Sequence, residues 1–163
     1  MARPASKPVP GEMHTITPHL YFNGNCEEAV DFYQKALGAN LACPVMKGPE
    51  GKGVMHAMLQ IGDSHVMLAD ACPGHREKGP SDGVTTGFWL YVENCDAWFQ
   101  RAVDAGCEVL MQLNDAFWGD RFGQVKDPFG HCWSFATHKW DLTPEEMNQR
   151  QEEFLHAVAD QSA

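Results

Sequence analysis

The chain has 163 residues and a formal net charge of −10 at neutral pH, a length that fits one domain or two small modules sharing a core. The acidic balance argues against nucleic acid or an anionic membrane as a partner, because a basic surface that releases phosphate counterions is missing. No run of about 18 apolar residues is present to span a membrane, and residues 1–13 lack the apolar core of a signal peptide. The six cysteines lack zinc-finger spacing, so we expect a cytoplasmic protein with reduced thiols.

The first half of the chain predicts a β-α-β-β-β module at about residues 14–70. Residues 1–13 contain three prolines and few apolar side chains, which is typical of a flexible tail. Strands are expected at 16–22, 41–46, 54–61 and 65–70. A helix should start after an Asn25 N-cap, run to about Leu37 and stop at Gly38.

The same element order returns after a Gly- and Pro-rich linker at 70–83, which predicts a second module at about 84–138. Residues 20–26 line up with 89–95 at a constant offset, and Asn94 should cap a helix that Gly106 ends. Strands are expected at 87–92, 108–113, 124–126 and 132–136. Residues 143–163 begin with a Thr143–Glu146 capping box and predict a C-terminal helix to about Val158, followed by a tail.

The last of these strands follows an Asp-Pro-Phe-Gly turn at 127–130 and alternates large and small side chains. The large side chains Trp133 and Phe135 should pack against other residues on one face of the strand. The small side chains Ser134 and Ala136 should leave open space on the other face. Such a strand suits the wall of a cavity.

Five sequence segments together resemble the vicinal oxygen chelate superfamily of glyoxalases, bleomycin resistance proteins and extradiol dioxygenases, and most closely its PhnB-like branch. These segments are Phe22–Ala29, Phe32–Tyr33, Ala36–Ala39, Phe117–Arg121 and Asp127–His131. The resemblance implies an α+β fold in which both modules form one domain, at 14–142, with a curved mixed sheet around a cleft.

In this family, metal-dependent members take their ligands from positions that match Pro18, Met58, Gly87 and Ser134 here. Proline and glycine side chains cannot ligate a metal, and a thioether or a neutral hydroxyl is a poor ligand for a hard divalent cation. We therefore expect no metal and no cofactor. A metal-dependent lyase or dioxygenase acting on a substrate with vicinal oxygens remains the alternative, and an unusual site using His56 with His138 stays open. The methyltransferase label carried by this branch lacks support, because no Gly-x-Gly-x-x-Gly joins a strand to a helix.

Strand parity and one loop predict a cleft that binds a small organic ligand, with catalysis left open. The candidate ligand-binding residues are His56, Gln60, Trp89, Tyr91, Trp118, Arg121 and Ser134. The competing interpretations are a collapsed core with a satisfied histidine, and an Asp120–Arg121 pair that only fixes the loop. The C-terminal helix carries a sparse apolar stripe, so we also expect a homodimer that uses it; a dimer without any ligand is the third alternative.

Overall fold

The computed structural model describes residues 4–161, and its contacts divide the chain into two compact units between Gly83 and Val84. Residues 1–3 of the expected N-terminal tail and 162–163 of the C-terminal tail lie outside the described residues. The first unit contains β1 (His19–Phe22), α1 (Cys26–Ala36), β2 (Asn40–Leu41), β3 (Met46–Lys47), a 3-10 turn (Pro49–Gly51), β4 (Val54–Ile61) and β5 (Ser64–Asp70). The second contains β6 (Gly87–Tyr91), α2 (Cys95–Ala105), β7 (Glu108–Asp115), β8 (Asp120–Lys126), β9 (Cys132–His138) and α3 (Pro144–Gln161).

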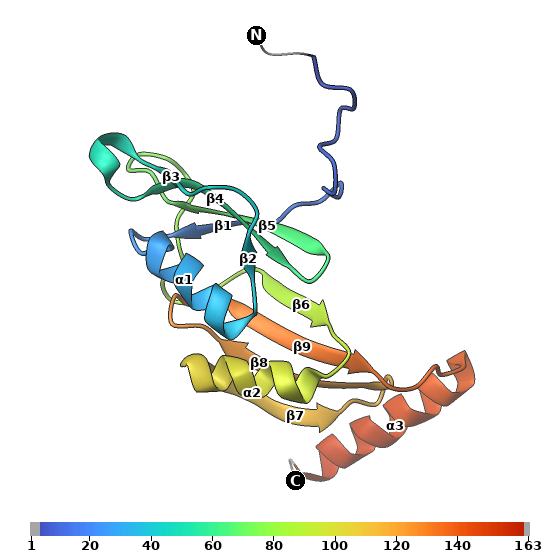
Figure 1. The fold of residues 1–163 in the computed structure, drawn as a ribbon. Helices are drawn as coiled ribbons and strands as arrows, with labels where there is room; N and C mark the ends of the chain where they lie inside the picture. Colours follow the sequence, from blue (N-terminus) through green and yellow to red (C-terminus); the bar gives the residue numbers. More distant parts are fainter. Residues whose placement is uncertain (1–3, 162–163) are drawn as a thin grey trace. The chain divides into compact units, whose positions relative to one another are not determined.

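The two units repeat one sheet topology (Figure 1). In the first, the order β1-β5-β4-β2 joins a parallel β1–β5 pair to antiparallel neighbours, with β3 also paired to β4. In the second, the order β6-β9-β8-β7 has a parallel β6–β9 pair and antiparallel neighbours. The predicted α+β class with two β-α-β-β-β modules and a C-terminal helix is therefore confirmed, with the strands distributed over two mixed sheets.

Each sheet packs one face against the helix of its own module. In the first unit, Ala29 and Tyr33 of α1 are buried together with Leu20 of β1 and Leu59 of β4. Burial of about 1.5–3 kcal/mol per large apolar side chain makes this contact the main source of the unit's stability. The opposite face of each sheet is consequently free of its own helix.

The start of α1 differs from the expectation, because Asn25 makes no side-chain cap. The Asp70 carboxylate, at the end of β5, instead accepts hydrogen bonds from the backbone N–H groups of Gly24 (2.9 Å) and Cys26 (3.0 Å). A carboxylate is favourable at the positive end of a helix. Burial, followed by the nearby Asp70, raises the pKa of the Cys26 thiol to about 12, so this helix-start cysteine is not activated.

The start of α2 agrees with the prediction, since the Asn94 side chain accepts a hydrogen bond from the Ala97 N–H at 3.1 Å. Gly106 ends the helix in the left-handed region with φ of 117°. Gly123 of β8 is required by packing, because a Cβ there would lie 2.7 Å from the ring of Phe99. The α2 helix therefore sits close to the centre of its sheet.

The Asp127–Gly130 turn is organised by one buried carboxylate. Asp127 is 2% exposed and accepts hydrogen bonds from the N–H groups of Phe129 (2.9 Å) and His131 (3.0 Å) and from Nε1 of Trp133 (2.8 Å). Gly130 has φ of 98°, the region that favours glycine. The turn thus fixes where β9 begins and which of its residues face α2.

Several predicted strands have different extents in the structure. The strand expected at 16–22 begins only at His19, and the one expected at 108–113 continues to Asp115. The strand expected at 41–46 is two short pieces, β2 and β3, which both pair with β4. The Ala42 N–H still donates to the Met58 carbonyl at 2.9 Å, and the interruption includes Pro44, which has no N–H to donate. The strand expected at 124–126 begins earlier, at Asp120. Within residues 4–161, no helix is both long enough and apolar enough to cross a bilayer.

Candidate functional site

The face of the second sheet that lies away from α2 carries a cluster of rings, which we call the aromatic face: Trp89 and Tyr91 of β6, Trp118 of the β7–β8 turn, and Phe122 of β8. Trp89 stacks on Phe122 with ring centroids 4.9 Å apart and lies 6.4 Å from Trp118 and 6.3 Å from Tyr91. Trp89 is 42% exposed and Tyr91 is 65% exposed. Large ring surfaces are therefore held in fixed positions on the surface of this unit.

One buried carboxylate holds this face together. Asp120 is 2% exposed, and its Oδ2 accepts hydrogen bonds from the Tyr91 hydroxyl and from Nε1 of Trp118, each at 2.9 Å. Its Oδ1 lies 2.7 Å from Nδ1 of His138, whose Nε2 lies 2.9 Å from Oδ1 of Asp141. Asp120 thus connects the ends of β6 and β9 to the β7–β8 turn and sets the positions of two rings.

The ionisation of this cluster follows from its contacts. Burial by itself raises the pKa of Asp120, but the hydrogen bonds from His138, Tyr91 and Trp118 outweigh it and the pKa lies below its ordinary value. The hydrogen bonds to Asp120 and then to Asp141 raise the pKa of His138. The hydrogen bond to Asp120 and then burial raise the pKa of the Tyr91 phenol. The cluster therefore favours a carboxylate, an imidazolium and a neutral phenol.

The structure corrects the expectation of open space in front of β9. Ser134 and Ala136 are 4% and 0% exposed, because their small side chains let rings from the neighbouring strands meet above them. Ser134 pairs with Trp89, and Ala136 pairs with Phe122. The Ser134 hydroxyl accepts a hydrogen bond from Nε2 of Gln124 at 3.2 Å. Ser134 therefore supports the aromatic face from below and does not form its surface.

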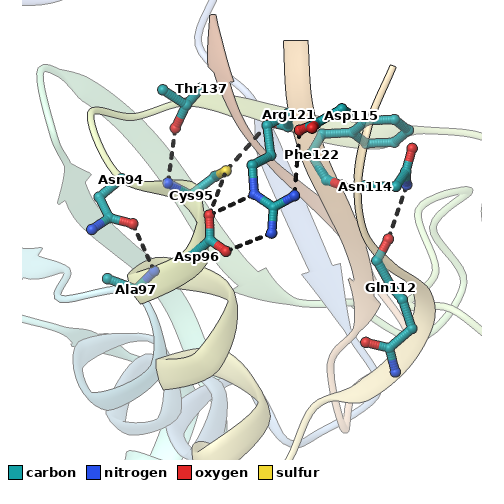
Figure 2. A network of polar contacts seen from close by, with 10 residues as sticks. All are labelled: Asn94, Cys95, Asp96, Ala97, Gln112, Asn114, Asp115, Arg121, Phe122 and Thr137. Carbon is teal, nitrogen blue, oxygen red and sulfur yellow. Dashed lines mark hydrogen bonds and ion pairs between the residues drawn. The ribbon is translucent and has the colours of Figure 1, made fainter. Parts of the chain in front are cut away.

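Arg121, expected beside Trp118, lies on the opposite face of the sheet, toward α2. Figure 2 shows its guanidinium against Asp96 at the start of that helix. Its Nε and Nη2 donate to the Asp96 carboxylate at 2.9 and 2.8 Å, and its Nη1 lies 3.3 Å from Asp115. Arg121 therefore forms structural ion pairs, as the alternative interpretation proposed. Its partners are Asp96 and Asp115, whereas that interpretation named Asp120.

The neighbourhood of Arg121 is built around the first turn of α2 (Figure 2). The Cys95 N–H donates to Oγ1 of Thr137 at 2.8 Å, and the Thr137 hydroxyl donates to the Val92 carbonyl at 2.9 Å. The Cys95 thiol donates to the Arg121 carbonyl at 3.3 Å. These contacts attach α2 to β8 and β9, so this polar network is structural.

His56 and Gln60 lie in the first unit, on the face of β4 away from α1. His56 pairs with Met46 and Gln60 with His65, and both residues are half-buried. The Gln60 amide donates to the carbonyl of Gly62 at 3.2 Å. The structure thus brings Trp89, Tyr91 and Trp118 together in one unit and leaves His56 and Gln60 in the other.

The residues at the family's metal-ligand positions do not fit a hard divalent metal. The Pro18 carbonyl is used by the Met67 N–H at 2.9 Å, Met58 offers only a thioether, Gly87 has no side chain and Ser134 is engaged with Gln124. Among residues 4–161, no three His, Cys, Asp or Glu side chains gather in a group that could hold a metal. A metal site that uses His56 with His138 would require a ring nitrogen of His138 to lose its contact with Asp120 or Asp141.

Sequence reasoning missed Asp120 and Asp141 as members of the site and gave Phe122 no role. Asp120, Phe122 and Gln124 alternate along β8 and share a face with Ser134, Ala136 and His138. This alternation is visible in the sequence, but it points to one face only if the strand starts at Asp120. A strand assumed to start at Gln124 hides the first two residues in a loop.

Comparisons with known proteins agree with this fold. The family model described as "Glyoxalase/Bleomycin resistance protein/Dioxygenase superfamily" matches residues 14–135. An uncharacterized protein of Mycobacterium bovis is 39% identical over 137 residues, which cover 81% of this chain and 88% of that protein. Protein YjdN of Escherichia coli is 30% identical over 151 residues, covering 78% of this chain and 98% of YjdN.

A similar solved structure is that of protein PA1353 from Pseudomonas aeruginosa. It is 30% identical in sequence, and the superposition has a TM-score of 0.61 and covers 77% of this chain and 98% of the other.

Proposed function

Because the chain belongs to the glyoxalase/bleomycin resistance protein/dioxygenase superfamily, we propose that it binds a small organic molecule on the aromatic face of its second unit, without a metal at the family's ligand positions. The observation that carries the proposal is the exposure of Trp89, at 42%, in a stack whose other side is fixed by Phe122. A flat ligand that stacks on the free side of Trp89 would remove exposed apolar surface from water.

The pre-arranged rings support this proposal energetically. Trp118 and Tyr91 are held by hydrogen bonds to Asp120, so little conformational entropy is lost when a ligand packs against them. Exposed aromatic side chains that are scattered singly need no explanation, whereas a fixed cluster of them is a typical recognition surface.

The binding proposal is tested by ligand-observed NMR with a panel of neutral bicyclic aromatic fragments. We expect saturation transfer from the protein to several fragments, lost in Trp89→Leu and retained in Trp98→Leu. Trp98 is the matched control because it contacts Phe135 on the α2 side of the same sheet. Equal signals from both variants would contradict a site at Trp89.

The metal-free part of the proposal has its own test. Elemental analysis of protein purified without chelators and then dialysed should find less than stoichiometric Ni, Zn, Mn or Fe. About one equivalent per chain would favour the metal-dependent lyase or dioxygenase, in which a Lewis acid holds vicinal oxygens of the substrate.

We further propose a homodimer that covers α3. Phe154, Leu155 and Val158 of this helix are 48%, 56% and 45% exposed, although Phe154 also contacts Phe117 with ring centroids 5.3 Å apart. The helix begins with the reciprocal capping box, in which the Thr143 N–H donates to Glu146 at 2.9 Å and the Glu146 N–H donates to Oγ1 of Thr143 at 3.2 Å.

Sedimentation of the full chain and of a chain truncated after Leu142 tests the dimer. A full-length monomer at micromolar concentration contradicts it, and a truncated chain that stays dimeric removes α3 from the interface.

Two finer assignments complete the proposal. The segments Phe117–Arg121 and Asp127–His131 favour the PhnB-like branch. A phylogeny that groups the chain with another branch would contradict this assignment.

The cysteines support a reducing, cytoplasmic location, because all six are free. Cell fractionation that finds the protein outside the cytoplasm would contradict that location.

A further inference from the structure

We infer that the aromatic face selects a flat organic cation, such as an N-alkylated heteroaromatic ring, over neutral and anionic molecules of the same shape. The inference rests on the proposed function and adds the charge of its ligand. Three observations carry it: the donors of Tyr91, Trp118 and His138 are directed at carboxylates, the fixed charges of the face sum to a negative value, and the surfaces left for a ligand are electron-rich rings.

Four side chains of this face direct polar hydrogens at partners within the cluster, where those hydrogens are not free to attract an anion. The Tyr91 hydroxyl and the Trp118 indole N–H both donate to Asp120. The two ring nitrogens of His138 face Asp120 and Asp141, and the Gln124 amide donates to Ser134. To take a donor from Tyr91, Trp118 or His138, an anionic ligand would have to break a bond to a carboxylate, which would then have fewer donors.

The charged side chains of the face point to the same ligand. Asp120 and Asp141 flank His138, so two carboxylates and one imidazolium leave a net negative charge even when the histidine is protonated. Among the described residues of the second unit, Lys126 is the lysine or arginine whose strand position shares this face, and its ammonium pairs with Glu108 at 2.6 Å. The unit's other lysines and arginines are Arg101 on α2, Arg121 on the opposite face, Lys139 beyond the end of β9, and Arg150 on α3.

The remaining ligand surface is the π-electron faces of Trp89, Tyr91 and Trp118. Ring faces carry a negative quadrupole potential, and tryptophan attracts cations most strongly. A flat cation that stacks on Trp89 gains the contact area of a neutral ring together with this attraction. Its positive charge also lies near Asp120 and Asp141, where a neutral ring gains nothing.

Three bicyclic probes of nearly equal size separate charge from shape: 1-methylquinolinium, 1-methyl-2-quinolone and 1-naphthoate. The full-length protein is titrated with each, and Kd is read from the indole N–H signals, which are assigned by Trp→Phe substitutions. We expect 1-methylquinolinium to bind roughly 3- to 30-fold more tightly than 1-methyl-2-quinolone, and 1-naphthoate to bind most weakly. The ratio of the first two values should shrink as salt screens the charges.

Two variants test the origin of the selectivity. Asp141→Asn removes an exposed charge that contacts His138 but none of the tryptophan or tyrosine rings. It should weaken the binding of 1-methylquinolinium more than that of 1-methyl-2-quinolone, and so narrow the ratio of their two Kd values. Trp89→Leu should abolish binding of all three probes, and Trp98→Phe should abolish none.

The outcomes separate this inference from the proposed function. Equal Kd values for the cation and the neutral probe, or tightest binding of 1-naphthoate, would overturn the charge selectivity and leave the binding site in place. If none of the three probes shifts the Trp89 signal, both the inference and the proposed site fail.

Discussion

Replacing Asp120 with alanine tests whether this carboxylate is what holds the aromatic face together. The substitution leaves the Tyr91 hydroxyl and the Trp118 indole N–H without the acceptor that each now has at 2.9 Å. It also removes the contact between Asp120 and Nδ1 of His138. The rings should then lose their fixed positions, although the sheet behind them keeps its core.

The expected loss follows from the burial of each donor. A hydrogen bond to a charged acceptor contributes about 1.5–3 kcal/mol, and a neutral one about 0.5–1.5 kcal/mol. Tyr91 is exposed and Trp118 half-buried, so water replaces part of both bonds and we take about 1 kcal/mol for each. We count nothing for His138, because solvent screens a side chain that is 52% exposed. Asp120→Ala should therefore reduce the free energy of unfolding by about 2 kcal/mol.

Urea denaturation followed by near-ultraviolet circular dichroism measures this loss. Asp120→Asn is the matched control, because its amide oxygen still accepts from Tyr91 and Trp118 while its NH₂ group faces His138. It should cost less than the alanine variant and should keep the near-ultraviolet spectrum of the tryptophans. An alanine variant within about 0.5 kcal/mol of wild type, a difference typical of neutral surface substitutions, would refute this role of Asp120.

Three further predictions concern packing, backbone conformation and pH. Gly123→Ala places a Cβ 2.7 Å from the Phe99 ring and should lower the free energy of unfolding, measured by urea denaturation, by about 1–3 kcal/mol. An unchanged free energy would show that α2 can move away from β8 to make room. Gly130→Val forces φ of 98° on a β-branched residue and should lower the free energy of unfolding by about 1 kcal/mol or more. An unchanged Tm would show that the turn does not need a positive φ at this position. The His138 imidazole should titrate in NMR above the ordinary value of about 6.5, since its pKa is raised. The stability that its protonation adds is complete below that ordinary pKa and is lost as the pH rises through the folded pKa. In His138→Gln, the loss of stability with rising pH should disappear. A titration midpoint of the wild-type His138 imidazole at or below about 6.5 would show that the two aspartates do not raise its pKa.

Much of the fold is predictable from local signals in the sequence. The Asn94 cap, the Gly106 stop and the Thr143–Glu146 capping box all lie where the pattern indicates. Asn25 has the same pattern as Asn94 but makes no cap, because Asp70, 45 positions along the chain, reaches the helix start instead. A contact between residues that distant in sequence has no local signal.

The candidate site was only partly predictable for the same reason. Strand parity places Trp89 and Tyr91 on one face, because side chains alternate along a strand whatever its neighbours are. Parity does not say that Ser134 and Ala136 lie beneath rings from the strands on either side, which depends on register. Nor does it say that Arg121 pairs with Asp96 of α2, a contact that only the packing of helix on sheet creates.

A crystal structure of protein purified without chelators and soaked with 1-methylquinolinium would show whether the aromatic face binds a flat cation and whether the family's ligand positions hold a metal. We expect flat density stacked on the exposed side of Trp89, with Asp120 still hydrogen-bonded to Tyr91 and Trp118. We expect no anomalous peak beside Met58 or Ser134. A metal bound at those positions would contradict the metal-free proposal, and a probe bound only elsewhere on the chain would contradict the site at Trp89.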